Sequence, residues 1–255
     1  MLIDTHSHIY SEEFDLDRKE TLLRAKADKV DKILLPNIDE NSVNRVFALY
    51  ESDKKMFFPM MGLYPGSVGE NVEEQLSKML PFVKQNNVFA IGEIGLDFYW
   101  NRDYYDNQIF AFKQQLLWSR DLGNKPICIH CRKAFEEIFQ CLKEDGRPRF
   151  KGVFHCFSGD INQAKKVIEM GFLLGVGGVV TFKNAHLAQV VEQTDIKNIV
   201  LETDAPYLAP VPYRGKRNES SYIKIIAEKV AQIKQLSFEQ VAEQTTYNAE
   251  QLFAI

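Results

Sequence analysis

The chain has 255 residues, of which 45% are hydrophobic and 26% are charged, and its formal net charge is -4 at pH 7. This composition is typical of a globular protein with a large core, and the negative charge excludes a protein that coats nucleic acid through a generally basic surface. An enzyme whose bound cations supply positive charge locally is not excluded.

The sequence shows no signal for export or for a membrane span. Its longest apolar run, residues 172–182, is interrupted by glycines and is too short to cross a bilayer. Candidate catalytic residues begin at Asp4, so we expect no signal peptide. The cysteines follow no disulfide framework, as is usual in a reducing compartment: Cys128, Cys131, Cys141 and Cys156. We therefore expect a cytoplasmic protein that does not bind membranes.

Short apolar strands alternate with helices along the chain. In chain order, we expect strands at residues 1–8, 32–36, 57–63, 88–93, 126–130, 152–155, 172–175 and 198–202. Helices are expected at 15–30, 41–52, 72–85, 105–122, 133–143, 161–170 and 185–191, and two closing helices at 222–233 and 238–253. This alternation predicts a single-domain α/β protein over residues 1–255, a (β/α)8 TIM barrel. A doubly wound open sheet would give a similar pattern.

Two of these helices have recognisable features. The last one opens with Ser237 and Gln240 in the spacing of a capping box. The first is expected to be amphipathic, with four apolar residues on one side: Leu16, Leu22, Leu23 and Ala27.

Two histidines, His6 and His8, end the first expected strand. Side chains alternate between the faces of a strand, so these two imidazoles should point the same way. Such a pair suits a divalent metal, with Asp4 and Ser7 close enough to support the ligands. Taken alone, the pair is equally compatible with two incidental histidines.

Further residues of metal-binding type fall at later strand ends. Glu93 ends the fourth strand, and His130, His155 and Asp204 come at the ends of the fifth, sixth and eighth. A closed barrel would bring them into one pocket with His6 and His8, whereas an open sheet would spread them along an edge. Four imidazoles and two carboxylates suit two ions such as Zn²⁺ or Mn²⁺, with a bridging carboxylate, better than Mg²⁺.

Two other features receive a structural interpretation. We interpret His186 as a surface residue of a helix whose N-cap is Asn184. Cys128 and Cys131 form a C-x-x-C sequence, but the pair lies along a strand instead of opening a helix, so we do not expect redox chemistry.

Four motifs resemble those of the TatD family of metal-dependent deoxyribonucleases: Asp4-Thr5-His6-Ser7-His8, Gly92-Glu93-Ile94-Gly95-Leu96-Asp97, His155-Cys156-Phe157-Ser158-Gly159 and Leu201-Glu202-Thr203-Asp204-Ala205-Pro206-Tyr207-Leu208. A fifth motif extends the match, Arg214-Gly215-Lys216-Arg217-Asn218-Glu219. The resemblance covers essentially the whole chain and implies an amidohydrolase-like barrel. It also implies that one metal is held by His6, His8 and Asp204 and the second by His130 and His155, with Glu93 bridging them.

The chain departs from the family pattern at two places. Tyr64 stands where the family usually has a histidine, and a tyrosine can hydrogen-bond a phosphate but cannot carry a proton near neutral pH. Residues 218–221 lack the proline that commonly follows Glu219 in the family, which we interpret as a minor loop change.

Several residues are candidates for substrate contact besides Tyr64. Arg214, Lys216 and Arg217 follow the eighth strand, where barrel enzymes often bind phosphate, although a solvated basic loop has the same composition. Aromatic residues crowd the loop after the fourth strand, where they could stack on unpaired bases or close the barrel top: Phe98, Tyr99, Trp100, Tyr104 and Tyr105. Asp97 could order this loop or support a metal ligand.

The resemblance predicts a 3′→5′ exodeoxyribonuclease with a preference for single-stranded DNA and with two divalent ions (Zn, Mn or Mg). The sequence leaves the oligomeric state open, and we favour a monomer. We expect Asp204 to accept a proton from a water activated between the ions that Glu93 bridges. D-aminoacyl-tRNA deacylation and amide or ester hydrolysis of a small molecule are alternatives on the same barrel. Amidohydrolase relatives with small substrates often use a modified lysine as the bridge, so Glu93 favours the nuclease. A metal-dependent scaffold without activity is the alternative outside enzymes.

Overall fold

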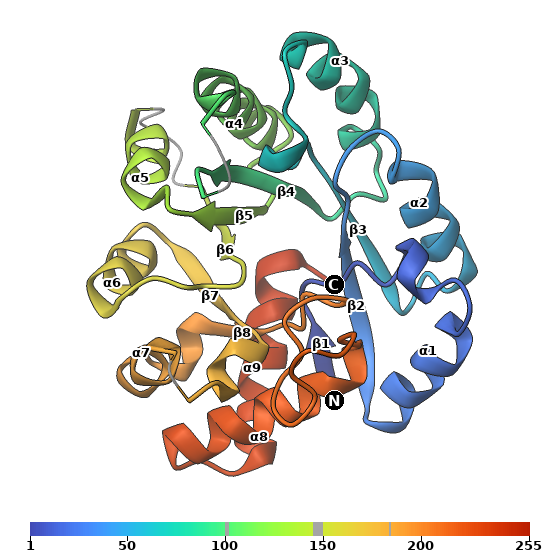
Figure 1. The fold of residues 1–255 in the computed structure, drawn as a ribbon, viewed down its shortest axis with the longest axis vertical. Coiled ribbons are helices and arrows are strands. Elements are labelled where there is room, and N and C mark those ends of the chain that lie inside the picture. The colour runs from blue at the N-terminus through green and yellow to red at the C-terminus, as the bar shows by residue number, and fades with distance from the viewer. Residues whose placement is uncertain (100–101, 145–149, 184) are drawn as a thin grey trace.

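The computed structural model describes residues 1–99, 102–144, 150–183 and 185–255. In this part of the chain, eight parallel strands form one sheet in which each strand pairs with the next in sequence (Figure 1). The strands are β1 (Leu2–Asp4), β2 (Val30–Pro36), β3 (Phe57–Met61), β4 (Ala90–Asp97), β5 (Ile127–Arg132), β6 (Gly152–Phe154), β7 (Phe172–Val176) and β8 (Ile199–Leu201). The predicted barrel order is confirmed, because a doubly wound sheet would have a permuted strand order.

The ring closes just beyond the carboxyl ends of β1 and β8. The backbone N–H of Thr5 donates to the carbonyl of Leu201 at 3.1 Å, and that of His8 donates to Ala205 at 2.7 Å. Asp204 donates its N–H to the carbonyl of His6 at 2.9 Å. The seam between the first and last strands is therefore made by the segments that carry three of the predicted metal ligands.

Helices cover the outside of the sheet and, in the case of the last helix, one end of the barrel (Figure 1). They are α1 (Arg18–Ala27), α2 (Val43–Ser52), α3 (Val72–Val83), α4 (Tyr105–Asp121), α5 (Phe135–Glu144), α6 (Ile161–Glu169), α7 (Leu187–Gln193), α8 (Ile223–Lys234) and α9 (Phe238–Phe253). The predicted capping box at the start of α9 is present, with Ser237 accepting from the Gln240 N–H and Gln240 accepting from the Ser237 N–H. His186 is exposed and occupies the N-cap position of α7, while Asn184 lies outside the described residues.

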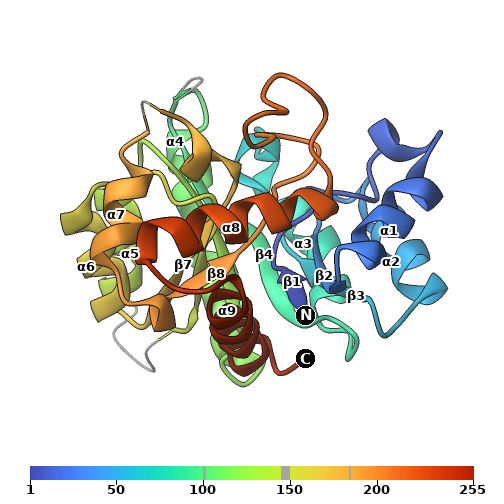
Figure 2. The same cartoon turned by 90° about the horizontal axis from the view of Figure 1, so that it is seen from below.

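The apolar core has two parts. The larger part fills the space between the sheet and the surrounding helices. The smaller part fills the barrel itself, where Ile3, Met60 and Val200 pack with Leu252 and Phe253 of α9. Figure 2 shows α9 and both termini at one end of the barrel, with the orange loop that follows β8 at the other. α9 and the interior core close the end of the barrel that carries the termini. The opposite end, where the strands have their carboxyl ends, is the place for a polar site.

The first helix differs from its prediction. It begins at Arg18, after a short 3-10 turn at Glu12–Phe14. The expected apolar face was wrong, since Leu16 is fully exposed and Leu23 is 59% exposed. Ala27 is also exposed and Leu22 is only partly buried, whereas Thr21 and Ala25 face the core.

Polar anchors explain the orientation of α1. Arg18 donates hydrogen bonds to the carbonyls of Ile9 and Tyr10, and Arg24 pairs with the buried Glu219 at 2.6 Å. These contacts come from distant parts of the chain, so they override the local apolar pattern.

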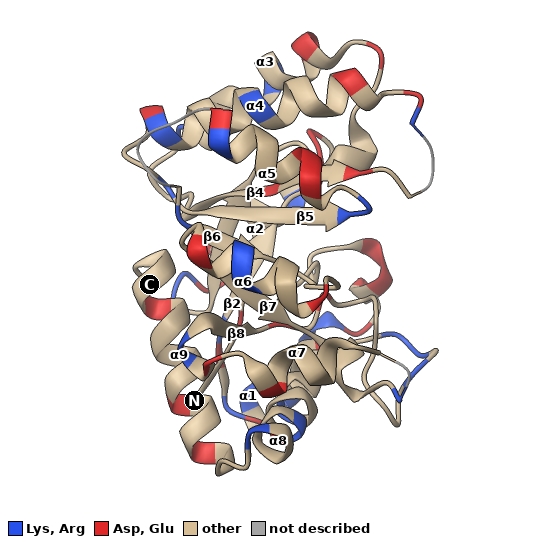
Figure 3. Cartoon of the chain, turned by 90° about the vertical axis from the view of Figure 1, so that its left-hand side faces the viewer, with Lys and Arg blue, Asp and Glu red and all other residues tan. Residues whose placement is uncertain are grey.

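Charged residues are spread over the outside of the molecule. In the view of Figure 3, lysines and arginines are interspersed with aspartates and glutamates on the helices of that side. Among the described residues, no helix combines the length and the apolar character that crossing a membrane requires.

Candidate metal centre

The structure brings the six predicted ligands together at the carboxyl ends of the strands. Their positions are the segment after β1 for His6 and His8, β4 for Glu93, β5 for His130, the residue after β6 for His155, and the segment after β8 for Asp204. The polar cluster thus draws on five separate parts of the barrel.

The two histidines near the N-terminus do not lie on a regular strand, because β1 ends at Asp4. Ser7, which lies between them, forms an isolated parallel bridge with Ala205. The two imidazoles point toward the same place, as predicted, since the Nε2 atoms of His6 and His8 lie 3.2 Å apart.

Glu93 was expected at the end of its strand but lies within β4, which continues to Asp97. Ile91 pairs with Ile127 and Ile94 pairs with Ile129, so β4 has one more residue than β5 in this interval. Such a bulge re-aims the side chains beside it. Gly92 has no room for a side chain here, since an added Cβ would lie 2.6 Å from the Cβ of Cys128.

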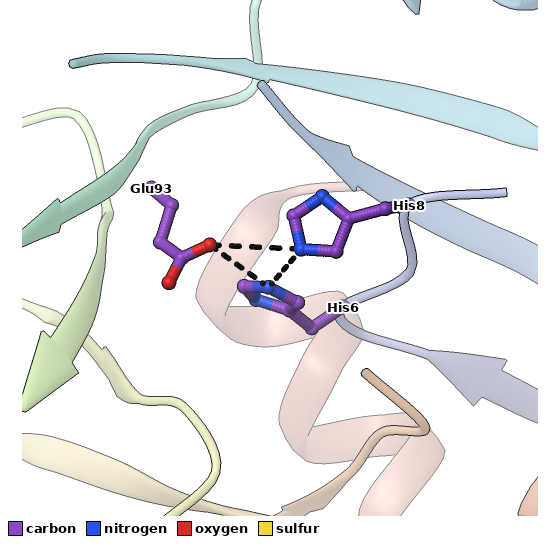
Figure 4. Close-up of side chains that lie close together, drawn as sticks. All are labelled: His6, His8 and Glu93. Carbon is purple, nitrogen blue, oxygen red and sulfur yellow. Dashed lines mark hydrogen bonds and ion pairs between the residues drawn. The ribbon is translucent and has the colours of Figure 1, made fainter. Parts of the chain in front are cut away.

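The carboxylate of Glu93 faces two pairs of histidines. Its Oε2 lies 3.4 Å from His6 Nε2 and 3.6 Å from His8 Nε2 (Figure 4). Its Oε1 lies 2.8 Å from both His130 Nδ1 and His155 Nε2. Glu93 is only 2% exposed, and within the described residues its ion-pair contacts are all with histidines.

Asp204 completes the first of these groups. Its Oδ1 lies 3.7 Å from His6 Nε2 and 3.6 Å from His8 Nε2. Burial raises the pKa of Asp204, but the hydrogen bond with His8 and the charge of nearby histidines outweigh it and lower the pKa overall. The group is therefore a carboxylate near neutral pH.

The donor set fits divalent metal ions. Ligand atoms of His6, His8 and Glu93 lie within 4.8 Å of one another, as do those of Glu93, His130 and His155. The Nε2 atoms of His6 and His8 lie 3.2 Å apart, and His130 Nδ1 lies 3.1 Å from His155 Nε2. Two facing lone pairs repel each other unless a proton or a metal cation lies between them. Neutral imidazole and carboxylate are the donors that zinc and manganese accept.

Supporting hydrogen bonds orient two of the histidines. The Tyr10 hydroxyl donates to the carbonyl of Pro36 at 2.6 Å, so it accepts from His8 Nδ1 at 2.9 Å, which leaves the lone pair on Nε2. His130 Nε2 lies 3.0 Å from Asp97 Oδ2, which leaves Nδ1 facing Glu93. The other oxygen of Asp97 accepts from the Tyr99 N–H at 3.0 Å. Asp97 therefore serves both of the roles that the sequence left open.

The charges of the cluster also affect the imidazoles. Burial is the largest influence on His6 and lowers its pKa to about 4, so His6 is neutral near pH 7. For His130, burial is outweighed by the carboxylates of Asp97 and Glu93, which raise its pKa to about 9. A divalent cation would compete with the second proton of the His130 ring, because it carries a larger positive charge near the Asp97 and Glu93 carboxylates.

Asp4 and Ser7 bond to segments that lie beside them, and in the described contacts neither side chain bonds an imidazole nitrogen. The Asp4 carboxylate accepts from the N–H and the hydroxyl of Thr203, at 2.9 and 2.6 Å. Ser7 accepts from the hydroxyl of Ser220 at 3.2 Å. These bonds hold the segment of Asp204 against that of His6.

One further buried carboxyl group lies behind the cluster. Glu202 follows β8, is fully buried, and accepts a hydrogen bond from the Cys156 N–H. Burial raises the pKa of Glu202 well above its usual range, and the neighbouring carboxylates of Asp204 and Asp4 add to the effect. Sequence reasoning gave Glu202 no role.

Tyr64 lies at the edge of the cluster. Its ring stands nearly perpendicular to that of His130, with the centroids 5.0 Å apart. Burial and the nearby Glu93 and Asp97 carboxylates raise the pKa of the Tyr64 hydroxyl, which therefore keeps its proton near neutral pH.

The three basic residues after β8 have other partners. Arg217 pairs with Asp17 through both guanidinium nitrogens, at 2.8 and 2.6 Å, and lies over the ring of Phe14. Arg214 lies over the ring of Phe182, and Lys216 over that of Tyr213. In the contacts of the described residues, none of the three reaches the six predicted ligands.

The aromatic residues after β4 divide into two kinds. Phe98 is buried and stacks on Tyr105 with centroids 4.6 Å apart, and both rings pack in the core between the sheet and the helices. Tyr99 and Tyr104 are 45% and 40% exposed. The guanidinium of Arg132, at the end of β5, lies 3.9 Å from the Tyr99 ring centroid, and Lys133 Nζ lies 5.0 Å from it. Trp100 falls outside the described residues.

Arg132 is a candidate that sequence reasoning missed. Its position two residues after His130, at the end of the same strand, was the available signal. Tyr207 is a second, since it is 55% exposed and meets the ring of His8 edge-on at 6.1 Å.

The four cysteines are free thiols. Burial raises the pKa of Cys128 and of Cys131, which disfavours the thiolate that redox exchange requires. Cys128 instead contacts His6, with its Sγ 3.3 Å from Nδ1.

Comparisons with known proteins agree with this geometry. The profile of a family described as TatD related DNase matches residues 3–254. An uncharacterized metal-dependent hydrolase of Bacillus subtilis, YabD, is 39% identical over 256 residues, which cover 100% of both chains. Among solved structures, the TatD homolog YjjV of Escherichia coli superposes with a TM-score of 0.92 at 26% identity, covering 100% of this chain and 98% of that one.

A more distant structure shares the fold alone. The phosphotriesterase homology protein of Escherichia coli, solved with phosphate in its active site, superposes with a TM-score of 0.71 at 12% identity and covers 99% of this chain and 98% of its own.

Proposed function

The chain belongs to the TatD-related DNase family of metal-dependent hydrolases, and on that premise we propose that it hydrolyses phosphodiester bonds of DNA, as a 3′→5′ exonuclease that prefers single strands. One observation carries the proposal, namely that the two oxygens of the buried Glu93 carboxylate face two separate pairs of histidines. This arrangement suits the two-metal hydrolysis of phosphate esters.

His6, His8 and Asp204 would hold one ion and His130 and His155 the other, with Glu93 between them. When bound, two ions of the zinc or manganese type supply charge that stabilises phosphate oxygens and lowers the pKa of water. The imidazole-rich donor set is less suited to magnesium.

Residues of the chain perform the remaining tasks. Asp204 is a carboxylate near neutral pH, and its side chain is 13% exposed, so it can accept a proton at Oδ1 or Oδ2. The protonated hydroxyl of Tyr64, beside His130, can donate a hydrogen bond to a phosphate oxygen. Tyr64 does not transfer a proton itself, because losing it would place another negative charge beside Glu93 and Asp97.

The rim of the site supports a single-stranded nucleic acid as substrate. Tyr99, just after β4, has a ring that is 45% exposed, and the cations of Arg132 and Lys133 lie over it. Exposed rings next to cations are typical of proteins that bind single strands by stacking and by phosphate contact. Arg214, Lys216 and Arg217 remain proposed phosphate contacts, and a phosphate at Arg217 would compete with Asp17.

The test is one panel of substrates. Metal-free protein is reconstituted with Zn²⁺, Mn²⁺ or Mg²⁺ and given 3′- and 5′-labelled single- and double-stranded oligonucleotides, a D-aminoacyl-tRNA, and small esters and lactones. We expect stepwise shortening of single strands from the 3′ end, lost in His155→Gln but kept in His186→Gln, a matched change at an exposed histidine. Turnover of only the D-aminoacyl-tRNA or the small molecules would refute the nuclease proposal.

We further propose that the protein acts as a monomer in a reducing cytoplasm, where its four free thiols would persist. Size-exclusion chromatography with light scattering, at the concentration used for the nuclease assay, tests the monomer.

A further inference from the structure

Each of the four clustered histidines has one nitrogen near the other ligands and a second nitrogen turned away. For three of them the second nitrogen has a partner: Tyr10 for His8, Asp97 for His130, and Cys128 for His6. Such partners fix the orientation of a ligating imidazole and raise its basicity. The fourth, His155 Nδ1, is buried and has no hydrogen-bond partner among the described residues.

The group that faces His155 Nδ1 is the carboxyl of Glu202. Its Oε1 lies 3.8 Å away, slightly beyond a hydrogen bond, and accepts from the Cys156 N–H. The other oxygen, Oε2, is buried and also lacks a hydrogen-bond partner among the described residues. Unsatisfied polar atoms are costly in a protein interior. A small movement of either side chain would bring His155 Nδ1 within hydrogen-bond distance of Glu202 Oε1.

The fold reserves the space that Glu202 occupies. Gly175 on β7 lies against it, and a Cβ at that position would be 2.4 Å from Glu202 Oε2 and 2.8 Å from its Cδ. The backbone N–H of Glu202 also donates to the carbonyl of Val176 at 3.2 Å, which ties the residue to the same strand. The barrel wall therefore has room for the Glu202 carboxyl group only as long as position 175 carries no side chain.

The plane of the His155 ring is fixed by packing, and only the choice between its two flipped orientations remains. His6 stacks on it with centroids 3.9 Å apart and ring planes within 8° of parallel, so the plane of the ring is fixed. A rotation of 180° about the Cβ–Cγ bond would keep that plane but put ring carbons where Nδ1 and Nε2 now lie. An acceptor at Nδ1 selects the orientation that directs Nε2 toward Glu93 and His130.

We propose that Glu202 is a positioning residue that accepts a hydrogen bond from His155 Nδ1–H and so holds His155 Nε2 in place as a ligand for the second metal ion. The inference rests on the proposed metal centre. It does not depend on which phosphate or carboxylic ester the enzyme cleaves.

Two substitutions separate this role from simple packing. Glu202→Gln keeps a carbonyl oxygen that can accept from both Cys156 N–H and His155 Nδ1–H. Glu202→Met has a similar length but no acceptor. Glu219→Met is the control, because Glu219 is also a buried carboxylate but pairs with Arg24 and Ser221, away from the histidines.

The first readout is metal affinity, measured by titrating the metal-free protein with Zn²⁺ against a competing chelator. We expect one of two zinc equivalents to bind roughly 10- to 100-fold more weakly in Glu202→Met, which is the usual effect of losing such a partner. Glu202→Gln and Glu219→Met should bind both equivalents as the wild type does. Equal affinities in Glu202→Met and the wild type, or a full loss in Glu202→Gln, would overturn the proposal.

The second readout is taken on the wild-type protein, so it does not depend on whether a variant folds. In zinc-loaded, ¹⁵N-labelled wild-type protein, the Nδ1 proton of His155 should resonate at the low field of a hydrogen-bonded imidazole N–H. A wild-type Nδ1 proton without a hydrogen-bond shift, or a zinc bond at Nδ1, contradicts the proposal. If these readouts hold while no oligonucleotide is cleaved, the nuclease proposal fails and the role of Glu202 stands.

Discussion

Removing a single oxygen atom, in Tyr10→Phe, tests how the chain prepares His8 as a ligand. The Tyr10 hydroxyl is buried and lies between His8 Nδ1 at 2.9 Å and the Pro36 carbonyl at 2.6 Å. Phenylalanine fills the same space, so the change removes two hydrogen bonds without opening a cavity of the size of a side chain.

The size of the effect follows from those two bonds. A buried polar group that loses its partner costs about 1–3 kcal/mol, and both His8 Nδ1 and the Pro36 carbonyl lose theirs. Some relaxation is expected, so we predict a loss of ~2–4 kcal/mol in the stability of the metal-free protein. In a protein of this size each kcal/mol corresponds to a shift of about 2–4 °C in Tm. We also expect the affinity of one zinc equivalent to fall roughly 10- to 100-fold, because the tautomer of His8 is no longer selected.

Thermal unfolding of metal-free protein and competitive zinc titration measure the two effects. Tyr247→Phe is the matched control, since Tyr247 is 56% exposed and should change neither quantity. If Tyr10→Phe lowers Tm but leaves both zinc affinities unchanged, the hydroxyl is structural only, and the reasoning about His8 is wrong.

Three further outcomes are expected. Gly175→Ala should lower stability in urea by about 1–3 kcal/mol through overpacking against Glu202, and an unchanged midpoint would show that the strand can move aside. Asp204→Asn, loaded with metal to the wild-type content, should have a much lower kcat on an oligonucleotide with little change in KM. Near-normal turnover would exclude Asp204 as proton acceptor. Replacing Arg132 and Lys133 with glutamine should weaken binding of single-stranded DNA and flatten its dependence on salt, and an unaltered salt slope would remove them from the phosphate path.

The architecture was predictable because it depends on patterns that repeat along the chain. Alternating apolar strands and helices predicted the barrel, and the spacing of Ser237 and Gln240 predicted the start of α9. Residues at the ends of parallel strands meet in a closed barrel whatever the details of each loop. The convergence of the six predicted ligands required no more than this rule and the residue types.

Features set by distant contacts were not predictable in the same way. The face of α1 is decided by arginine contacts to Ile9 and Glu219, and the position of Glu93 within β4 by a bulge against β5. Likewise, the partners of the imidazoles come from elsewhere in the chain. Asp97 and His130 are 33 residues apart in sequence, and no local pattern connects them.

Arg217 shows the limit of reasoning from residue type. A basic loop after the eighth strand predicts phosphate contact, but Asp17, 200 residues earlier, already holds the guanidinium through two hydrogen bonds. The same residue can fasten a loop or bind a substrate, and only the position of its partners separates the two.

Anomalous diffraction from crystals grown with zinc or manganese shows whether Glu93 lies between two metal ions. We expect two anomalous peaks, one beside His6, His8 and Asp204 and one beside His130 and His155, each next to a different oxygen of Glu93. A single peak, or two peaks of which neither contacts Glu93, would contradict this expectation.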